Sequence, residues 1–201
     1  DASKSARAFK NPAPILSKPA VRPLIDGSPR SIIEYGAGNL RNVRFLLQKG
    51  HRVSVVELLP TIERYRDEYA EFRRKGGVVF TWETSNFRST SPRKFDIALI
   101  TFVLETICRP SERRGLLEHC RRSLKKSGVL VLSVRGHRDV VAANASGTPC
   151  SDGYSTSGKT FIRGFDLKEI SHLLLQSGFT SIRALHSRNP KNPELLHVLA
   201  K

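Results

Sequence analysis

The stretch Ser31-Ile-Ile-Glu-Tyr-Gly-Ala-Gly-Asn39 decides the fold of this 201-residue chain. Its apolar start is typical of a buried β-strand, and the two glycines predict a tight turn that opens a helix. A second apolar run, Val53-Ser-Val-Val-Glu57, ends in a carboxylate 21 residues beyond Gly36. In a βαβ nucleotide fold, an acid at about this spacing binds a ribose. The pattern therefore indicates a cofactor that carries an adenosine.

The glycine pattern also argues against two other nucleotide ligands. A dinucleotide pyrophosphate requires a third glycine for close packing of helix on strand, and Arg41 stands at that position, which disfavours NAD and FAD. The segment from Gly153 to Thr160 satisfies the phosphate-loop pattern. However, the nearest predicted strand ends at Val134, and Gly164 interrupts the chain before the next helix, so a triphosphate site is the weaker interpretation.

The motif Glu34-x-Gly36-x-Gly38 with Glu57 resembles motif I and its acidic partner in the class I S-adenosylmethionine (SAM) methyltransferases. The resemblance runs from about Ile32 to the C-terminus. It implies that Glu34 helps to hold the amino-acid end of SAM and that the backbone of Gly36, Ala37 and Gly38 approaches the ligand. It also implies that Glu57, with Leu58 beside it, binds the ribose hydroxyls. Leu40 stands where the family often has a further glycine, and an ordinary α/β turn is the alternative for the motif taken by itself.

The same resemblance assigns residues at the ends of two later strands. Glu83 and Thr84 follow the third predicted strand, where the family places residues around the adenine ring. Thr101 and Phe102 end the fourth, where the family has residues that touch SAM on one side and substrate on the other. SAM is thus the expected cofactor and S-adenosylhomocysteine the expected product.

The order of apolar runs predicts an α/β fold with a seven-stranded, mostly parallel, doubly wound sheet whose last strand is antiparallel, which is the class I methyltransferase fold. The short connection between the last two strands suits an antiparallel pair. The predicted strands are 31–35, 53–57, 78–82, 95–101, 129–134, 181–185 and 195–200, and the predicted helices are 41–50, 62–75, 112–126 and 165–175.

We expect two parts in the chain: a basic, proline-rich N-terminal arm over residues 1–30 and a methyltransferase domain over residues 31–201. No apolar stretch is long enough for a transmembrane helix, and the start lacks the apolar core of a signal peptide. A weak organelle-targeting alternative remains for the Lys-, Arg- and Ser-containing start. Cys108, Cys120 and Cys150 are irregularly spaced, which supports neither a zinc site nor a disulfide framework. We expect a cytoplasmic protein that binds no metal and no membrane.

The formal charge of +16 at a pI near 10.4 points to a partner rather than to a reaction. Such a surface attracts polyanions, so RNA, DNA or another polyanion is the expected partner. The alternative is that the charges are solvated helix faces, and no aromatic residues are interleaved to mark an RNA-binding module. The basic residues concerned are Arg113, Arg114, Arg121, Arg122, Lys125 and Lys126 in one predicted helix, Arg73, Arg74 and Lys75 at the end of another, and Lys4, Arg7, Lys10, Lys18 and Arg22 in the arm.

The candidate catalytic residues are Glu105, His137 and Tyr154, with Lys159 as a further candidate base. Each also has a plain interpretation as a loop or surface residue, and Glu105 as an acid at a helix start. The fourth strand lacks the Asp/Asn-Pro-Pro-aromatic turn of DNA amino-methyltransferases, which disfavours adenine-N6 and cytosine-N4 transfer. Cys150 follows a proline, as in cytosine-C5 enzymes, but lies after the fifth predicted strand, so it is a weak candidate nucleophile.

The polar segment from Gly147 to Gly164 is too long for a plain connection and predicts a lid beside the site. With its flanking residues it looks similar to a bacterial group of DNA-phosphorothioation-associated methyltransferases, a likeness of general pattern that implies no substrate. The favoured function is SAM-dependent methyl transfer to a nucleic acid or other anionic acceptor. The alternatives are methylation of a small molecule and a non-catalytic module that binds SAM or nucleic acid.

Overall fold

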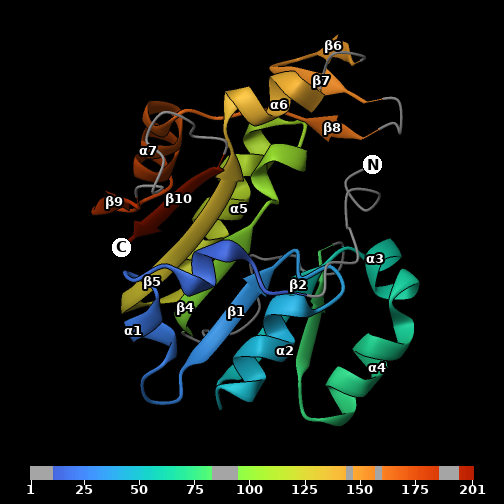
Figure 1. Cartoon of the computed structure of the whole chain (residues 1–201), viewed down its shortest axis with the longest axis vertical. Coiled ribbons are helices and arrows are strands. Elements are labelled where there is room, and N and C mark those ends of the chain that lie inside the picture. Colours follow the sequence, from blue (N-terminus) through green and yellow to red (C-terminus); the bar gives the residue numbers. More distant parts are fainter. Residues whose placement is uncertain (1–10, 83–94, 144–146, 157–159, 186–194) are drawn as a thin grey trace.

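A computed structural model describes residues 11–82, 95–143, 147–156, 160–185 and 195–201 (Figure 1). Its centre is a seven-stranded sheet in the order β3-β2-β1-β4-β5-β10-β9. Strands β1 to β5 are parallel, whereas β10 runs antiparallel to both of its neighbours. The predicted class I methyltransferase sheet is therefore confirmed. The strands are β1 (Ser31–Tyr35), β2 (Arg52–Glu57), β3 (Val78–Thr81), β4 (Phe95–Thr101), β5 (Leu124–Arg135), β9 (Ile182–Ala184) and β10 (Leu195–Ala200).

Helices cover both faces of this sheet (Figure 1). Within the described part of the chain, no helix is long and apolar enough to cross a membrane. The α-helices are α1 (Arg22–Ile25), α2 (Arg41–Gln48), α3 (Leu59–Arg64), α4 (Arg66–Arg74), α5 (Pro110–Ser123), α6 (His137–Ala143) and α7 (Leu167–Gln176), and the 3-10 turns are η2 (Pro14–Ser17) and η3 (Leu104–Thr106).

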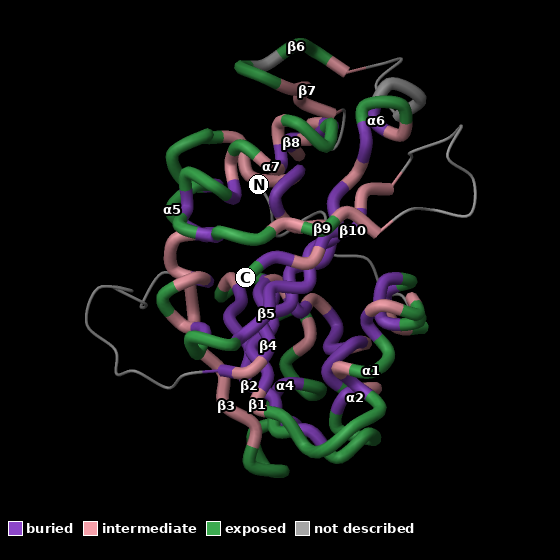
Figure 2. The backbone as a smooth tube through the Cα atoms, turned by 90° about the vertical axis from the view of Figure 1, so that its left-hand side faces the viewer, coloured by how far each residue is buried: buried purple, intermediate pink, exposed green. Residues whose placement is uncertain are grey.

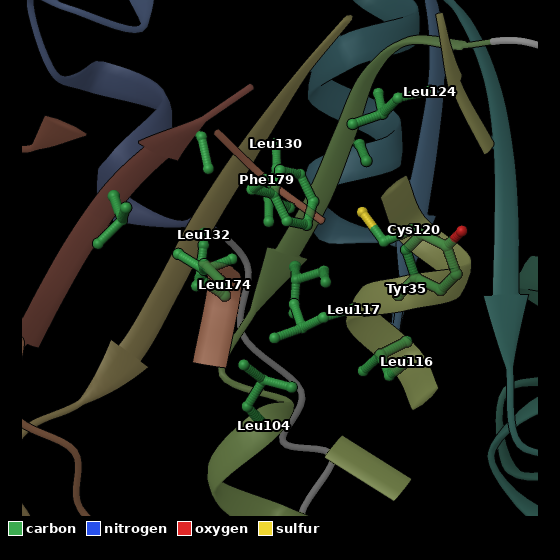
Figure 3. Packing of buried hydrophobic residues seen from close by; sticks show 14 of the residues in the cluster. Tyr35, Leu104, Leu116, Leu117, Cys120, Leu124, Leu130, Leu132, Leu174 and Phe179 are labelled. Carbon is green, nitrogen blue, oxygen red and sulfur yellow. The ribbon is translucent and has the colours of Figure 1, made fainter. Parts of the chain in front are cut away.

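Two apolar clusters hold the layers together, because alternate residues of each strand face opposite sides. Ile33 and Tyr35 face the cluster formed with α5 and α7, whereas Ile32 faces the cluster formed with α2, α4 and the N-terminal segment. Figure 3 shows Leu117 and Cys120 of α5 among the side chains of the first cluster. The central strands are buried on both faces (Figure 2), as their continuous apolar runs predict.

Part of the expected N-terminal arm is packed on the domain. Ile15, Leu16, Val21 and Ile25 are at most 3% exposed and belong to the same cluster as the side chains of α2. Apolar positions in η2 and α1 produce this packing, because the proline-rich sequence forms short turns rather than an extended strand. Residues 13–25 therefore form part of the core, and only residues 1–10 of the arm lie outside the described chain.

Two predicted element boundaries were wrong. Helix α5 ends at Ser123, and β5 begins at Leu124 rather than at Val129. Leu124 pairs with Phe95 and Val129 pairs with Ile97, so the exposed residues between Leu124 and Val129, which look helical in the sequence, form a bulge within the strand. The predicted helix 62–75 is two helices, α3 and α4, that break at Tyr65.

The predicted lid segment contains regular structure that the sequence did not suggest. Strands β6 (Thr148–Cys150), β7 (Gly153–Ser155) and β8 (Phe161–Ile162) form a small antiparallel sheet, which lies beyond α6 in Figure 1. Asp152, between β6 and β7, makes ion pairs with Arg113 of α5 and with Arg163. We call β6–β8 the roof, because residues of this segment lie over the cavity described below.

Candidate functional site

A cavity of about 1090 Å³ lies at the carboxyl ends of the parallel strands. The chain runs outward from β1 to β3 and then returns to the other side of β1 with β4. Ligands of open α/β sheets bind at such a reversal of strand order. Glu34, Glu57, Thr101 and Arg135, from the ends of four strands, all line the cavity.

The glycine turn forms one wall. Gly36 and Gly38 have φ angles of 69° and 54°, a region that favours glycine. A Cβ atom on Gly36 would lie 2.4 Å from Cγ2 of Val103, so this position also has no room for a side chain. The Tyr69 hydroxyl donates to the carbonyl oxygen of Gly38 over 3.0 Å. The turn is thus fixed with its backbone against the cavity.

Glu57, at the end of β2, orders the same turn. Its Oε2 accepts from the Gly38 N–H over 2.7 Å, and its Oε1 accepts from the Leu58 N–H over 2.8 Å. The side chain is 6% exposed and lines the cavity. Each carboxylate oxygen accepts more than one hydrogen bond, so Glu57 can hold the turn and still accept from two ligand hydroxyls.

Glu34, at the end of β1, is held from one side only. Asn42 Nδ2 donates to Glu34 Oε1 over 2.6 Å and lies 3.2 Å from Oγ1 of Thr101, while Asn42 Oδ1 accepts from the Ala13 N–H over 2.7 Å. Glu34 Oε2 is buried and has no hydrogen-bond partner. Burial raises the pKa of Glu34 to about 8, against the opposing effect of the Asn42 hydrogen bond. This oxygen is suited to a donor carried by a ligand.

Beyond β4 the chain turns sharply at Phe102, whose φ is 60°. A bulky residue with a positive φ is an outlier that its surroundings must hold in place. Here the Phe102 N–H donates to the carbonyl oxygen of Ser133 over 2.9 Å, and the Arg135 guanidinium lies 6.0 Å from the centre of the ring. The turn brings both Phe102 and Glu105 to the cavity wall.

Glu105, in η3, is 1% exposed, and neither of its carboxyl oxygens has a hydrogen-bond partner. Arg135 Nε lies 3.9 Å from Oε1, and the Arg135 guanidinium is also paired with Asp139. Burial raises the pKa of Glu105 to about 8, while nearby backbone N–H groups and the Arg135 charge act in the opposite direction. Glu105, Arg135 and Asp139 all line the cavity.

The cavity brings together nine of the thirteen predicted site residues. They are Glu34, Gly36, Ala37, Gly38, Glu57, Leu58, Thr101, Phe102 and Glu105. Glu83, Thr84 and the further candidate Lys159 lie outside the described residues. Their contribution stays a prediction.

His137 and Tyr154 do not line the cavity, in contrast to what their sequence positions suggested. The His137 side chain is 55% exposed, with Nε2 3.0 Å from Oε2 of Glu169 on α7. Tyr154 is in β7, where strand pairing places it between Pro149 and Ile162 of the roof. The geometry therefore supports Glu105 alone among the three candidate catalytic residues.

Sequence reasoning missed several residues of the wall. Asn42 is a polar residue on the buried side of the α2 helix, and this break in an apolar face was the available signal. Arg135 ends β5 and Asp139 lies in α6 directly after it; the strand end indicated the position of the site but not these two residues. Thr156 and Thr160 line the cavity from the roof, and nothing in the sequence distinguishes them from other polar loop residues.

Comparisons with known proteins agree with this geometry. The profile of a family described as "Methyltransferase domain" matches residues 33–130. No curated protein sequence matches the chain. Among solved structures, the 1,6-didemethyltoxoflavin-N1-methyltransferase of Burkholderia thailandensis, with bound 1,6-didemethyltoxoflavin and S-adenosylhomocysteine, is similar at 21% identity over 90% of this chain and 73% of that chain, with a TM-score of 0.59.

Two further structures match nearly end to end. The CcbJ methyltransferase of Streptomyces caelestis has 14% identity over 99% of this chain and 95% of that chain, with a TM-score of 0.69. A SAM-dependent methyltransferase of Methanosarcina mazei has 19% identity over 94% of this chain and 96% of that chain, with a TM-score of 0.65. These structural similarities support the fold. The residues that the family profile matches include the glycine turn and the strands on either side of it.

Proposed function

We propose that this chain is a class I SAM-dependent methyltransferase that transfers the methyl group to a small molecule bound inside the cavity. One observation carries the proposal. Among the described residues, the buried side-chain nitrogen and oxygen atoms without a partner are Glu34 Oε2 and both carboxyl oxygens of Glu105. Both residues line the same cavity, so it offers one acidic group for the cofactor and a second for the acceptor.

The residues of the glycine turn fit SAM. Glu34 Oε2 would accept from the ammonium group of the cofactor and Glu57 from the ribose hydroxyls, and the turn at Gly36 and Gly38, with its positive φ angles, would bring its backbone against the ligand. When bound, SAM supplies an electrophilic methyl group on a sulfonium. The protein then has to orient the acceptor and exclude water. The roof would exclude water, because its residues Phe161 and Ile162 line the cavity.

The placement of two groups of basic residues supports a small acceptor over a polyanion. Arg121, Arg122, Lys125 and Lys126 lie where α5 ends and β5 begins, and Arg73 to Lys75 lie just before the start of β3. Strand starts are at the edge of the sheet opposite to the cavity, because the ends of the strands line it. A polyanion held by these residues would be remote from the cofactor.

A polyanionic acceptor such as RNA or DNA is the second candidate, and the overall charge of +16 favours it. Asn11 and Pro12 line the cavity, and the basic residues Lys4, Arg7 and Lys10 precede them directly in the sequence. These cations would then contact phosphates while one nucleotide enters the cavity. Binding of this kind weakens steeply as the salt concentration rises.

Calorimetric titration with S-adenosylhomocysteine tests the cofactor half. We expect Glu57→Ala to weaken binding about tenfold to a hundredfold, since hydrogen bonds to a charged group contribute ~1.5–3 kcal/mol. Glu68→Ala, which removes an exposed carboxylate from α4, should bind like the wild type. Absence of heat with the wild-type protein, or unchanged affinity of Glu57→Ala, would contradict the proposed function.

Formation of S-adenosylhomocysteine with fractionated acceptors tests the acceptor half. Small-molecule extract, total RNA and DNA are supplied separately, each at low and at high salt. The proposal expects turnover with the small-molecule fraction that salt changes little. Turnover with RNA or DNA that falls steeply with salt would favour the second candidate, and SAM binding without turnover on any fraction would favour a non-catalytic module.

A further inference from the structure

The unpartnered carboxyl group of Glu105 is the strongest unexplained feature of the molecule. Both oxygens are buried and without a hydrogen-bond partner, although the residue is part of the wall of a large cavity. A buried carboxyl without partners is costly. Such a cost is tolerated at sites where a ligand provides the missing partners.

The groups that face Glu105 come from three elements. Arg135 of β5 approaches Oε1 to 3.9 Å, but its guanidinium is paired with Asp139 of α6. From the segment after β8, the Arg163 N–H donates over 3.0 Å to the backbone carbonyl of Glu105 rather than to its carboxyl group. The backbone N–H groups of Glu105 and Arg135 act on the carboxyl group and lower its pKa, but neither carboxyl oxygen has a partner at hydrogen-bond geometry. This cluster holds two carboxyl groups and one guanidinium, so a ligand that brings hydrogen-bond donors satisfies it better than an anion.

The surrounding walls favour a flat apolar body on that ligand. Phe102, Ile107, Phe161 and Ile162 line the cavity along with Glu105. Aromatic and aliphatic walls with a few polar groups are typical of sites for small ring compounds. Two carboxyl oxygens of one side chain match two parallel N–H groups at the edge of such a ring.

We propose that Glu105 is the acceptor-binding residue and that it recognises a planar, nitrogen-containing compound through a pair of N–H donors, as in an amidine or an aminated heterocycle. This inference rests on the proposed function, because it names the chemical class of the small acceptor. Phe102 and Phe161 hold the ring in the acceptor half, and Glu105 sets which edge of the ring it presents.

Binding of a model compound tests this subsite without turnover. Benzamidine, which carries two parallel N–H donors on a planar ring, is titrated calorimetrically into the full chain at pH 8.5, with and without saturating S-adenosylhomocysteine. Benzoate and benzamide are the comparison ligands. We expect the wild type to bind benzamidine more tightly than benzoate, and Glu105→Gln to bind it about tenfold or more weakly. The control Glu68→Gln should match the wild type.

Several outcomes would overturn the inference. They are absence of benzamidine binding to the wild type, equal binding to Glu105→Gln, and tighter binding of benzoate than of benzamidine. If Glu105→Gln fails to fold, the order of the three ligands on the wild type still decides. Failure of the cofactor half would appear separately, as absence of heat with S-adenosylhomocysteine, and the titration of benzamidine alone would still test Glu105.

Discussion

Replacement of Glu105 by glutamine should change how the stability of this protein depends on pH. Burial raises the pKa of Glu105 from 4.5 to about 8 in the folded state. Between these values the folded protein keeps a proton that the unfolded chain releases. Glu105 therefore stabilises the fold fully below about pH 4.5, and this contribution is lost as the pH rises through 8. Glutamine resembles the protonated acid and does not titrate.

The size of the effect follows from the shift. Each pH unit between the two pKa values costs the wild type about 1.4 kcal/mol of unfolding free energy from this one group. Across the whole window the loss amounts to a few kcal/mol. Glu34 is shifted in the same direction to about 8, so the wild type loses stability from both groups, whereas Glu105→Gln retains only the loss from Glu34.

Urea unfolding measured from pH 5 to pH 8.5 checks this prediction, with fluorescence of the single tryptophan, Trp82, as the probe. The unfolding free energy of Glu105→Gln minus that of the wild type should grow by a few kcal/mol over this range. A constant offset between the two proteins is expected from the amide group and does not affect the slope. Parallel pH profiles of the two proteins would refute the reasoning.

Three further substitutions test how the walls of the cavity are built. Gly36→Ala should lower the unfolding free energy by about 2 kcal/mol or more. In a urea double-mutant cycle, the addition of Val103→Ala should restore the part of this stability lost to the clash but not the part lost to the positive φ. Full restoration of the unfolding free energy would contradict this. Asn42→Asp should lower the unfolding free energy by ~2–4 kcal/mol at pH 8 and by less at pH 5, where the neighbouring carboxyl group of Glu34 is protonated. Equal losses of unfolding free energy in urea at both pH values would rule out charge as the cause. Asp152→Ala should cost ~2 kcal/mol and speed proteolytic cleavage within the roof, because the Arg113 side chain, 2% exposed, loses its carboxylate partner; unchanged cleavage, followed by mass spectrometry, would show that the ion pairs do not hold the roof.

The sequence predicted best what depends on neighbouring residues. The apolar run of Phe95–Thr101 specified a strand buried on both faces, and the glycines before α2 specified a turn with positive φ angles. Glu34 and Glu57 line the cavity because they lie in the last two residues of parallel strands, and the ends of such strands meet at one edge of the sheet.

What the sequence left open depends on contacts between distant residues. The roof is held by an ion pair between Asp152 and Arg113, which are 39 positions apart. A pairing between such distant residues cannot be read from the local sequence, and the polar segment therefore looked like a loop. The early start of β5 depends on pairing with Phe95. His137 looked suitable for catalysis because it directly follows a strand, but the course of α6 leaves it beside Glu169 at the surface.

The hydrogen bond from Ala13 to Asn42 has a consequence for anyone who shortens this protein. Starting the polypeptide at residue 31, where the first strand begins, would strip Ile15 and Val21 from the side of the sheet that they cover. It would also leave the Asn42 amide oxygen without its donor, beside the carboxyl group assigned to the cofactor. A version beginning at Asn11 keeps both the cover over this side of the sheet and the donor to Asn42.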